Sequence, residues 1–182
     1  YSADFLRAFK KKIVSGTRNQ RYETVEIFND MRVIPLSLHS VINNVIKNEK
    51  EPLIRARLME IIHKKGLSSI LNVSILRNKL GQNYDAYLAA LNLGELEEKA
   101  RRVVPDLLGA VVPYPVNVAS SDIIKKYSDP LKTTFSLRAL GRIHKRADLV
   151  LPVLIDILER SESDLYWGRF QPDAAWAVGG YG

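Results

Sequence analysis

One phrase is written twice in this chain, and the repetition limits the folds it can adopt more than any other feature. Residues 93–111 read LGELEEKARRVVPDLLGAV, and residues 140–158 read LGRIHKRADLVLPVLIDIL. A shift of 47 positions pairs Gly94 with Gly141, Ala100 with Ala147, Val103 with Val150, Pro105 with Pro152 and Leu107 with Leu154. Because periods of about 20–50 residues are the signature of stacked repeats, we expect one structural unit to be built several times.

Weaker copies of the phrase occur on both sides of this pair. MEIIHKKG at 59–66 aligns with LGRIHKRA at 140–147, and AVGGYG at 177–182 begins the phrase again. The glycine position then falls, in steps of 34, 47 and 38 residues, at Glu60, Gly94, Gly141 and Gly179. Two helices in each period of this length are typical of an α-solenoid, in which helical hairpins stack on one another.

The pattern within each repeat is helical. Apolar residues recur at spacings of three and four, strong helix formers dominate, and no Asn-Gly hairpin turn occurs. Gly66 and Gly81 follow two such segments, where glycine commonly ends a helix, and Asp148 is placed to cap another. Helices are expected at about residues 3–14, 21–31, 35–48, 51–65, 68–80, 84–93, 102–111, 119–127, 132–146, 149–160 and 172–180.

The second copy of the phrase shows why a repeat of this kind needs neighbours. The helix expected at 149–160 carries an apolar stripe wider than one packing partner covers, so it should contact the repeats on either side. In the preceding helix, Gly141 costs about 1 kcal/mol of helix propensity relative to alanine. The recurrence of this glycine in one register predicts that a neighbouring backbone approaches it closely.

The segments SLRALGRIHKRADLVLPVLIDIL and AAWAVGGYG resemble HEAT repeats, especially the short HEAT-like repeats of phycobilisome lyases. That family combines an alanine-rich helix ending Ala-Leu-Gly-x-Ile with a short turn and a helix containing Val-Pro-x-Leu-Ile. The resemblance is good over 84–111 and 132–182, fair over 33–66 and poor over 1–32. It implies an all-α, right-handed superhelix of about four to five helical hairpins. Because this is a scaffold family, the resemblance specifies shape more than chemistry.

The expected organisation is a single α-solenoid over residues 1–182. Divergent basic helices occupy 1–32, and HEAT-like repeats occupy 33–182, with insertions near 111–131 and 161–172 that lengthen the repeat steps. The absence of cysteine excludes disulfides and thiolate sites and favours a cytoplasmic location. No apolar run approaches the ~18 residues of a membrane span.

The net charge of +7 is unevenly distributed along the chain. Residues 1–66 hold 13 Lys and Arg against 7 Asp and Glu, a net +6, whereas residues 67–182 hold 14 against 13, a net +1. A basic end of this kind favours an acidic partner, such as nucleic acid, an anionic membrane surface or an acidic protein face. The alternative is an ordinary solvated surface.

Motifs for catalysis or metal binding are absent from the sequence. His39, His63 and His144 are not spaced three or four apart, and no cysteine can complete a metal site. His63 and His144 share one register near a helix end, where histidine is commonly favourable. The glycines of GGYG at 179–182 lack the lysine and spacing of a phosphate-binding loop. No cofactor or metal is therefore expected.

A basic set in the second copy is a candidate surface for phosphate contacts. Its members share one face of the helix expected at 132–146, at positions i, i+4, i+7 and i+8: Arg138, Arg142, Lys145 and Arg146. Repeated around a solenoid, such a face would follow a nucleic-acid backbone. In the first copy of the phrase, the positions equivalent to Arg142 and Lys145 hold Glu95 and Glu98, so the basic face is not continuous from one repeat to the next. The alternative is salt bridging between neighbouring repeats, from these acids to basic residues beside them.

An aromatic insertion is the candidate surface for a protein partner. The segment DLYWGRFQPDAAW at 164–176 contains Tyr166, Trp167, Arg169 and Phe170. Tryptophan, tyrosine and arginine commonly anchor protein interfaces, and insertions in solenoids often lie on the binding face. The alternative is that these side chains fold back over the edge of the core.

Three functions follow as expectations. The first is a non-enzymatic scaffold that binds a protein partner through its concave face or the aromatic insertion. The second is a nucleic-acid-binding solenoid whose positive field comes from residues 1–66. The third is an enzyme, either a DNA glycosylase or a bilin lyase. This expectation rests on the resemblance alone, because proteins similar to HEAT repeats include both kinds of enzyme. Asp173 and Trp176 could take glycosylase roles, although no motif places them there.

Overall fold

The fold is helical throughout the part of the chain that the structure describes. The structure is a computed structural model, and it describes residues 1–82, 84–111, 129–161 and 165–182, without the side chains of residues 161, 165 and 166. Every regular element in these ranges is an α-helix or a short 3-10 helix, and no strand occurs among them. The expected all-α class is therefore confirmed. The helix expected at 119–127 lies outside the described residues.

The chain divides into two compact units, Tyr1–Ile75 and Leu76–Gly182. We call them unit 1 and unit 2 and describe each by itself. The helix α5 (Val73–Leu80) crosses the boundary between them. A single solenoid over the whole chain therefore stays a prediction.

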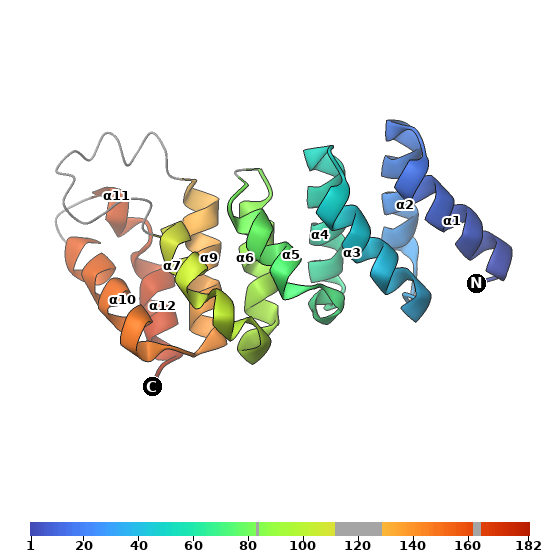
Figure 1. The fold of residues 1–182 in the computed structure, drawn as a ribbon. Helices are drawn as coiled ribbons and strands as arrows, with labels where there is room; N and C mark the ends of the chain where they lie inside the picture. Colours follow the sequence, from blue (N-terminus) through green and yellow to red (C-terminus); the bar gives the residue numbers. More distant parts are fainter. Residues whose placement is uncertain (83, 112–128, 162–164) are drawn as a thin grey trace. The chain divides into compact units, whose positions relative to one another are not determined.

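Unit 1 consists of two helical hairpins stacked on one another (Figure 1). Its helices are α1 (Ala3–Ser15), α2 (Arg18–Asp30), α3 (His39–Asn48) and α4 (Pro52–Lys64). Short 3-10 turns lie at Leu36–Leu38 before α3 and at Ser68–Ile70 after α4. Within the hairpins α1 packs on α2 and α3 on α4, and between them α1 packs on α3 and α2 on α4. The divergent residues 1–32 thus form a hairpin like the one that follows.

Local capping explains where the helices of unit 1 begin and end. The Thr17 hydroxyl accepts the amide hydrogen of Gln20, whose side chain accepts the Thr17 amide hydrogen in return, which forms a capping box at the start of α2. After α4, Gly66 takes a left-handed φ of 64°. Its amide donates to His63, and the amide of Leu67 donates to Ile62, the pattern of a glycine-terminated helix. The glycine stop expected at this position is confirmed.

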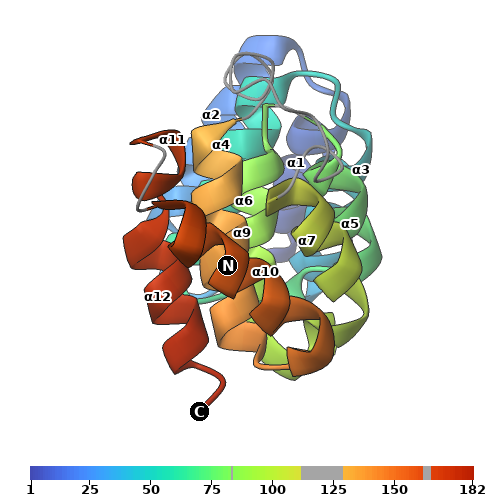
Figure 2. The same ribbon diagram turned by 90° about the vertical axis from the view of Figure 1, so that its left-hand side faces the viewer.

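Unit 2 arranges its helices in two layers (Figure 2). One layer holds α6 (Ala86–Glu95), α9 (Pro130–Ile143) and α12 (Gln171–Gly179), with α9 packed between the other two. The second layer holds α7 (Val104–Val111) and α10 (Ala147–Ser161), which contact each other and pack on α9 and α12 respectively. A 3-10 segment, Glu97–Val103, joins α6 to α7, and the short α11 (Leu165–Gly168) packs on α10.

Most helix boundaries in unit 2 lie within two residues of those expected, but the turn between α9 and α10 falls earlier. The helix expected at 132–146 ends at Ile143, because His144 and Arg146 take left-handed φ values of 49° and 60° that no helix can accommodate. The next helix begins at Ala147 and not at Leu149. Pro152 therefore lies inside the helix, where it removes one backbone hydrogen bond.

The repeated glycines sit where α6, α9 and α12 touch. A Cβ atom on Gly94 would lie 3.0 Å from the Cα of Ala139 in α9. A Cβ atom on Gly141 would lie 2.8 Å from the Cα of Ala177 in α12. The distance at Gly141 is shorter than a side chain tolerates, and the distance at Gly94 requires its neighbour to shift, so the predicted close backbone approach is confirmed at these two glycines. At Gly179, no atom of the described residues beyond its chain neighbours and its own helical backbone lies within 4 Å of the Cβ position, so the prediction fails there. Each partner alanine precedes the next repeat glycine by two residues, since Gly179 follows Ala177.

An ion-pair network joins the two hairpins of unit 1. Arg57 of α4 lies 2.8 Å from Glu26 of α2 and 3.1 Å from Glu60, which also pairs with Lys64. Hydrogen bonding from Arg57 lowers the pKa of Glu26, and hydrogen bonding from Lys64 and then Arg57 lowers the pKa of Glu60. The folded state therefore favours the ionised form of both carboxyl groups.

We expect this network to stabilise the fold at neutral pH and to lose its effect in acid. A depressed pKa in the folded state gives stability that is present above the unfolded value, about 4.3 for glutamate, and lost as the pH falls through the folded value. Glu60→Gln should cost less than about 1 kcal/mol at pH 7, since the pair is partly exposed. In urea unfolding, the difference from wild type should vanish near pH 3; a difference that persists there would contradict the assignment.

Candidate functional site

The four basic residues singled out in unit 2 are all paired with carboxylates. Arg142 of α9 pairs with Glu95 of α6. The other three pairs have N–O distances of 2.7, 3.3 and 3.1 Å and are Arg138–Asp173, Lys145–Glu98 and Arg146–Asp148. Because α9 ends at Ile143, the four do not share one helix face as expected. Their predicted contact with phosphates stays a prediction, and it would require these pairs to be broken or shared.

Two of the pairs follow the sequence repeat directly. The shift of 47 positions that superimposes the two phrases carries Glu95 onto Arg142 and Glu98 onto Lys145. Equivalent positions of neighbouring repeats thus hold opposite charges, and the side chains meet. The salt bridging between repeats that the sequence offered as an alternative is confirmed for both acids.

The buried part of the aromatic insertion belongs to the core of unit 2. Trp167 is 7% exposed and Phe170 is 1% exposed, and their rings form an edge contact with centroids 6.1 Å apart. The guanidinium of the exposed Arg169 lies over the Phe170 ring at 5.9 Å. The side chain of Tyr166 lies outside the described part of the structure. Partner binding by this group stays a prediction, but the two buried rings support the packing alternative.

The exposed aromatic residue of this region is Trp176 in α12. Its side chain is 52% exposed, and its ring edge covers the position where a Cβ atom on Gly141 would stand. Asp173, one turn earlier, accepts a hydrogen bond of 2.7 Å from Arg138, whose guanidinium also lies 5.6 Å from the Phe135 ring centre. The only carboxylate that the sequence suggested for a glycosylase role is thus held in an ion pair between α9 and α12.

His144 and Tyr181 close the end of α9. The Tyr181 hydroxyl lies 3.1 Å from the carbonyl oxygens of Leu140 and Lys145, to which it donates. Burial raises the pKa of Tyr181 to about 12. The His144 and Tyr181 rings meet edge to face at 6.1 Å. Within the described residues, no group of three or more His, Asp or Glu side chains gathers to hold a metal ion.

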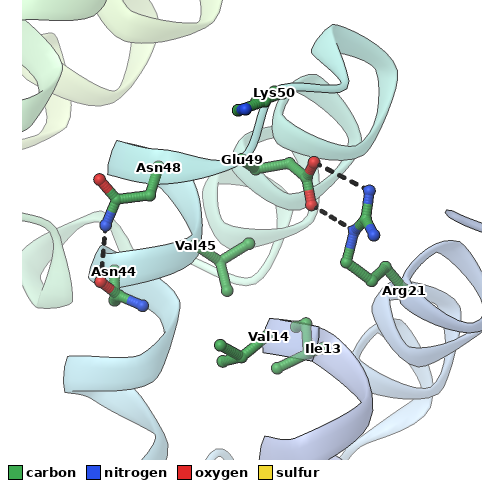
Figure 3. A pocket seen from close by; sticks show the side chains of 8 residues that line it. All are labelled: Ile13, Val14, Arg21, Asn44, Val45, Asn48, Glu49 and Lys50. Carbon is green, nitrogen blue, oxygen red and sulfur yellow. Dashed lines mark hydrogen bonds and ion pairs between the residues drawn. The ribbon is translucent and has the colours of Figure 1, made fainter. Parts of the chain in front are cut away.

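A pocket that sequence reasoning missed lies in unit 1 (Figure 3). It has a volume of about 260 Å³, and its walls come from α1, α2, α3 and the turn after α3. The lining residues are Ile13, Val14, Arg21, Asn44, Val45, Asn48, Glu49 and Lys50. The sequence feature that could have indicated this pocket is the pair Asn44 and Asn48 on the helix expected at 35–48. Their spacing of four residues places both side chains on one helix face.

The polar groups of the pocket form two separate pairs. Arg21 donates two hydrogen bonds to Glu49, of 2.7 and 3.2 Å, and a third to the carbonyl of Gly16. The Glu49 side chain is only 6% exposed. On α3, the Asn48 amide donates to the Asn44 side-chain oxygen at 2.7 Å. Figure 3 shows aliphatic side chains between the two pairs.

Cations without an acidic partner gather in unit 1. Among the described residues, no carboxylate pairs with the side chains of Lys10, Lys11, Lys12 or Lys50. The first three follow one another on α1, and Lys50 lies at the edge of the pocket. Unit 1 carries a net charge of +6 out of the +7 of the chain. These four lysine side chains on its surface can attract acidic groups.

No protein-family model, curated protein or solved structure was found to match this chain. The likeness to HEAT repeats therefore rests on the sequence phrase and stays a prediction. In the part of the chain that the structure describes, no helix is long and apolar enough to cross a membrane.

Proposed function

We propose that this chain is a HEAT-like helical-repeat scaffold that binds an acidic segment of a protein partner through unit 1. The observation that carries the proposal is the difference in net charge between the two units, since unit 1 holds a net +6 and unit 2 a net +1. In unit 2, the cations Arg138, Arg142 and Lys145 are used in pairs between neighbouring helices. In unit 1, Lys10, Lys11, Lys12 and Lys50 have no carboxylate partner among the described residues. Unpaired charge on a surface steers a partner of opposite sign toward it.

Three further observations support a protein partner. The helices of each unit pack on one another around buried apolar side chains, which leaves their outward faces available for recognition, as in repeat proteins generally. The pocket of unit 1 combines aliphatic side chains with side-chain amides, a mixture that suits polypeptide. Trp176 adds an exposed aromatic anchor on unit 2.

Nucleic acid is the competing acidic partner, and nuclease treatment separates the two. Tagged full-length chain would be incubated with cell extract, with and without nuclease, and retained proteins identified and then purified. We expect at least one protein to be retained after nuclease treatment and to bind again in purified form. Retention that nuclease abolishes, together with a mobility shift of short DNA or RNA at low salt, would overturn the proposal.

A pair of charge variants tests which unit attracts the partner. Replacing Lys10, Lys11 and Lys12 by glutamine should weaken the binding of the purified partner several-fold, since exposed charges act mainly on association. The control replaces Lys99, Arg101 and Arg102 of the 3-10 segment in unit 2, three exposed cations that likewise have no carboxylate partner among the described residues. Equal losses in the two variants would show that net charge matters and that unit 1 does not.

A further inference from the structure

The pocket of unit 1 carries groups that match the backbone of an extended peptide. We infer that it binds one residue, with the backbone on either side, of an extended acidic segment. The inference rests on the proposed function and adds the site and the conformation of the bound segment. Pockets that bind drug-sized ligands have volumes of about 300–1,000 Å³. A pocket of about 260 Å³ therefore suits a single side chain better than a cofactor.

The two asparagines supply the contacts to the backbone. Since Asn48 donates to the Asn44 oxygen, the Asn44 amide hydrogens and the Asn48 oxygen remain for a ligand. Both side chains are exposed, and they occupy adjacent turns of one helix face. In an extended chain, the N–H and C=O of one residue point to the same side. The asparagine pair can therefore accept the N–H and donate to the C=O of one residue.

The aliphatic wall selects an apolar side chain at the bound residue. Ile13 and Val45 are buried, whereas Val14 is 50% exposed, so the wall opens to solvent at Val14. Figure 3 places these three side chains beside the asparagine pair. Covering Val14 removes apolar surface from water, which favours binding by about 25 cal/mol for each Å² covered.

The charges of the pocket favour a flanking carboxylate and disfavour phosphate. Arg21 is already engaged by Glu49 and by a backbone carbonyl. The free cation is Lys50, for which no carboxylate partner exists among the described residues. The phosphodiester of nucleic acid accepts hydrogen bonds only, so it cannot donate to the remaining Asn48 oxygen, whereas a peptide N–H can. A peptide with acidic residues beside an apolar one meets all of these groups.

The experiment titrates isotope-labelled full-length chain with four synthetic heptapeptides. The first has a central isoleucine flanked by glutamates, and the second carries lysines in place of the glutamates. The third has alanine for isoleucine, and the fourth is the first with its central nitrogen methylated. We expect saturable shifts of the Asn44 and Asn48 side-chain amide signals with the first peptide. Binding should be weaker with the third and fourth peptides and absent with the second.

Variants assign the binding to the pocket. Asn44→Ala with Asn48→Ala should weaken the first peptide about fivefold or more, the effect of two neutral hydrogen bonds. Asn19→Ala is the control, because Asn19 is an exposed helical asparagine of unit 1 outside the pocket. Lys50→Gln should weaken binding more than Lys12→Gln, because Lys50 lies at the edge of the pocket and Lys12 does not line it. Circular dichroism of each variant excludes loss of fold as the cause.

Two outcomes would overturn the inference and leave the proposed function standing. One is equal binding of the glutamate and lysine peptides, and the other is unchanged affinity in the double asparagine variant. A duplex DNA oligonucleotide that displaces the first peptide and shifts the same amide signals would assign the pocket to nucleic acid. In contrast, the proposed function fails if nuclease treatment abolishes protein retention, or if the two charge variants weaken partner binding equally.

Discussion

Phe170→Ala is expected to destabilise unit 2 by about 3–5 kcal/mol, the usual effect of removing a buried aromatic ring. Phe170 is 1% exposed, and its ring contacts Trp167 and lies beneath the guanidinium of Arg169. Truncation leaves a cavity that its neighbours can fill only in part. Urea unfolding followed by tryptophan fluorescence measures the loss, because Trp167 and Trp176 both report on unit 2.

Trp176→Ala is the matched control for this prediction. About half of the Trp176 side chain already lies in water, at 52% exposure, so its removal should cost a much smaller share of stability. If the segment around Phe170 served partner binding and not packing, Phe170→Ala would leave the unfolding midpoint unchanged and reduce binding instead. That result would return the aromatic insertion to the interface.

Gly141→Ala is expected to destabilise unit 2 by about 1–3 kcal/mol, although alanine is the better helix former by about 1 kcal/mol. The new methyl group would stand 2.8 Å from the Ala177 backbone and 2.7 Å from the Trp176 ring, so α12 must move. Gly94→Ala should show a smaller loss, since the nearest backbone atom is 3.0 Å away.

Gly109→Ala gives the opposite sign and serves as the control. Gly109 lies inside α7, and among the described residues no atom beyond its chain neighbours and its own helical backbone stands within 4 Å of the position its Cβ would take. Without a clash, the gain in helix propensity remains, and stability should rise by up to about 1 kcal/mol. In thermal unfolding, the midpoint temperature should be highest for Gly109→Ala, lower for Gly94→Ala and lowest for Gly141→Ala. Equal effects at Gly109 and Gly141 would contradict a role for close packing.

The sequence predicted the features that follow from periodicity and small residues. Helix positions were largely right because each helix has a regular apolar stripe and a recognisable stop, such as Gly66. The charge pairing of Glu95 and Glu98 was anticipated because the repeat itself sets equivalent positions side by side. Such features need only the register of one repeat against the next.

Features that depend on loops or on side-chain exposure could not be predicted. The left-handed residues His144 and Arg146 end α9 early, although histidine and arginine give no such signal in sequence. Whether Trp167 faces a partner or the core depends on how the short α11 packs on α10. The pocket of unit 1 arises where residues of separate helices come together, so no local motif marks it.

The contacts of the repeated glycines also set the relative heights of the helices in unit 2. Gly94 faces Ala139, and Gly141 faces Ala177, each alanine lying two residues before the next glycine of the register. Each helix is thus displaced along its axis from the previous one by two residues, or about 3 Å. The two steps span 47 and 38 residues, yet the stagger is the same. The connecting segments can therefore lengthen, shorten and diversify without disturbing the stack.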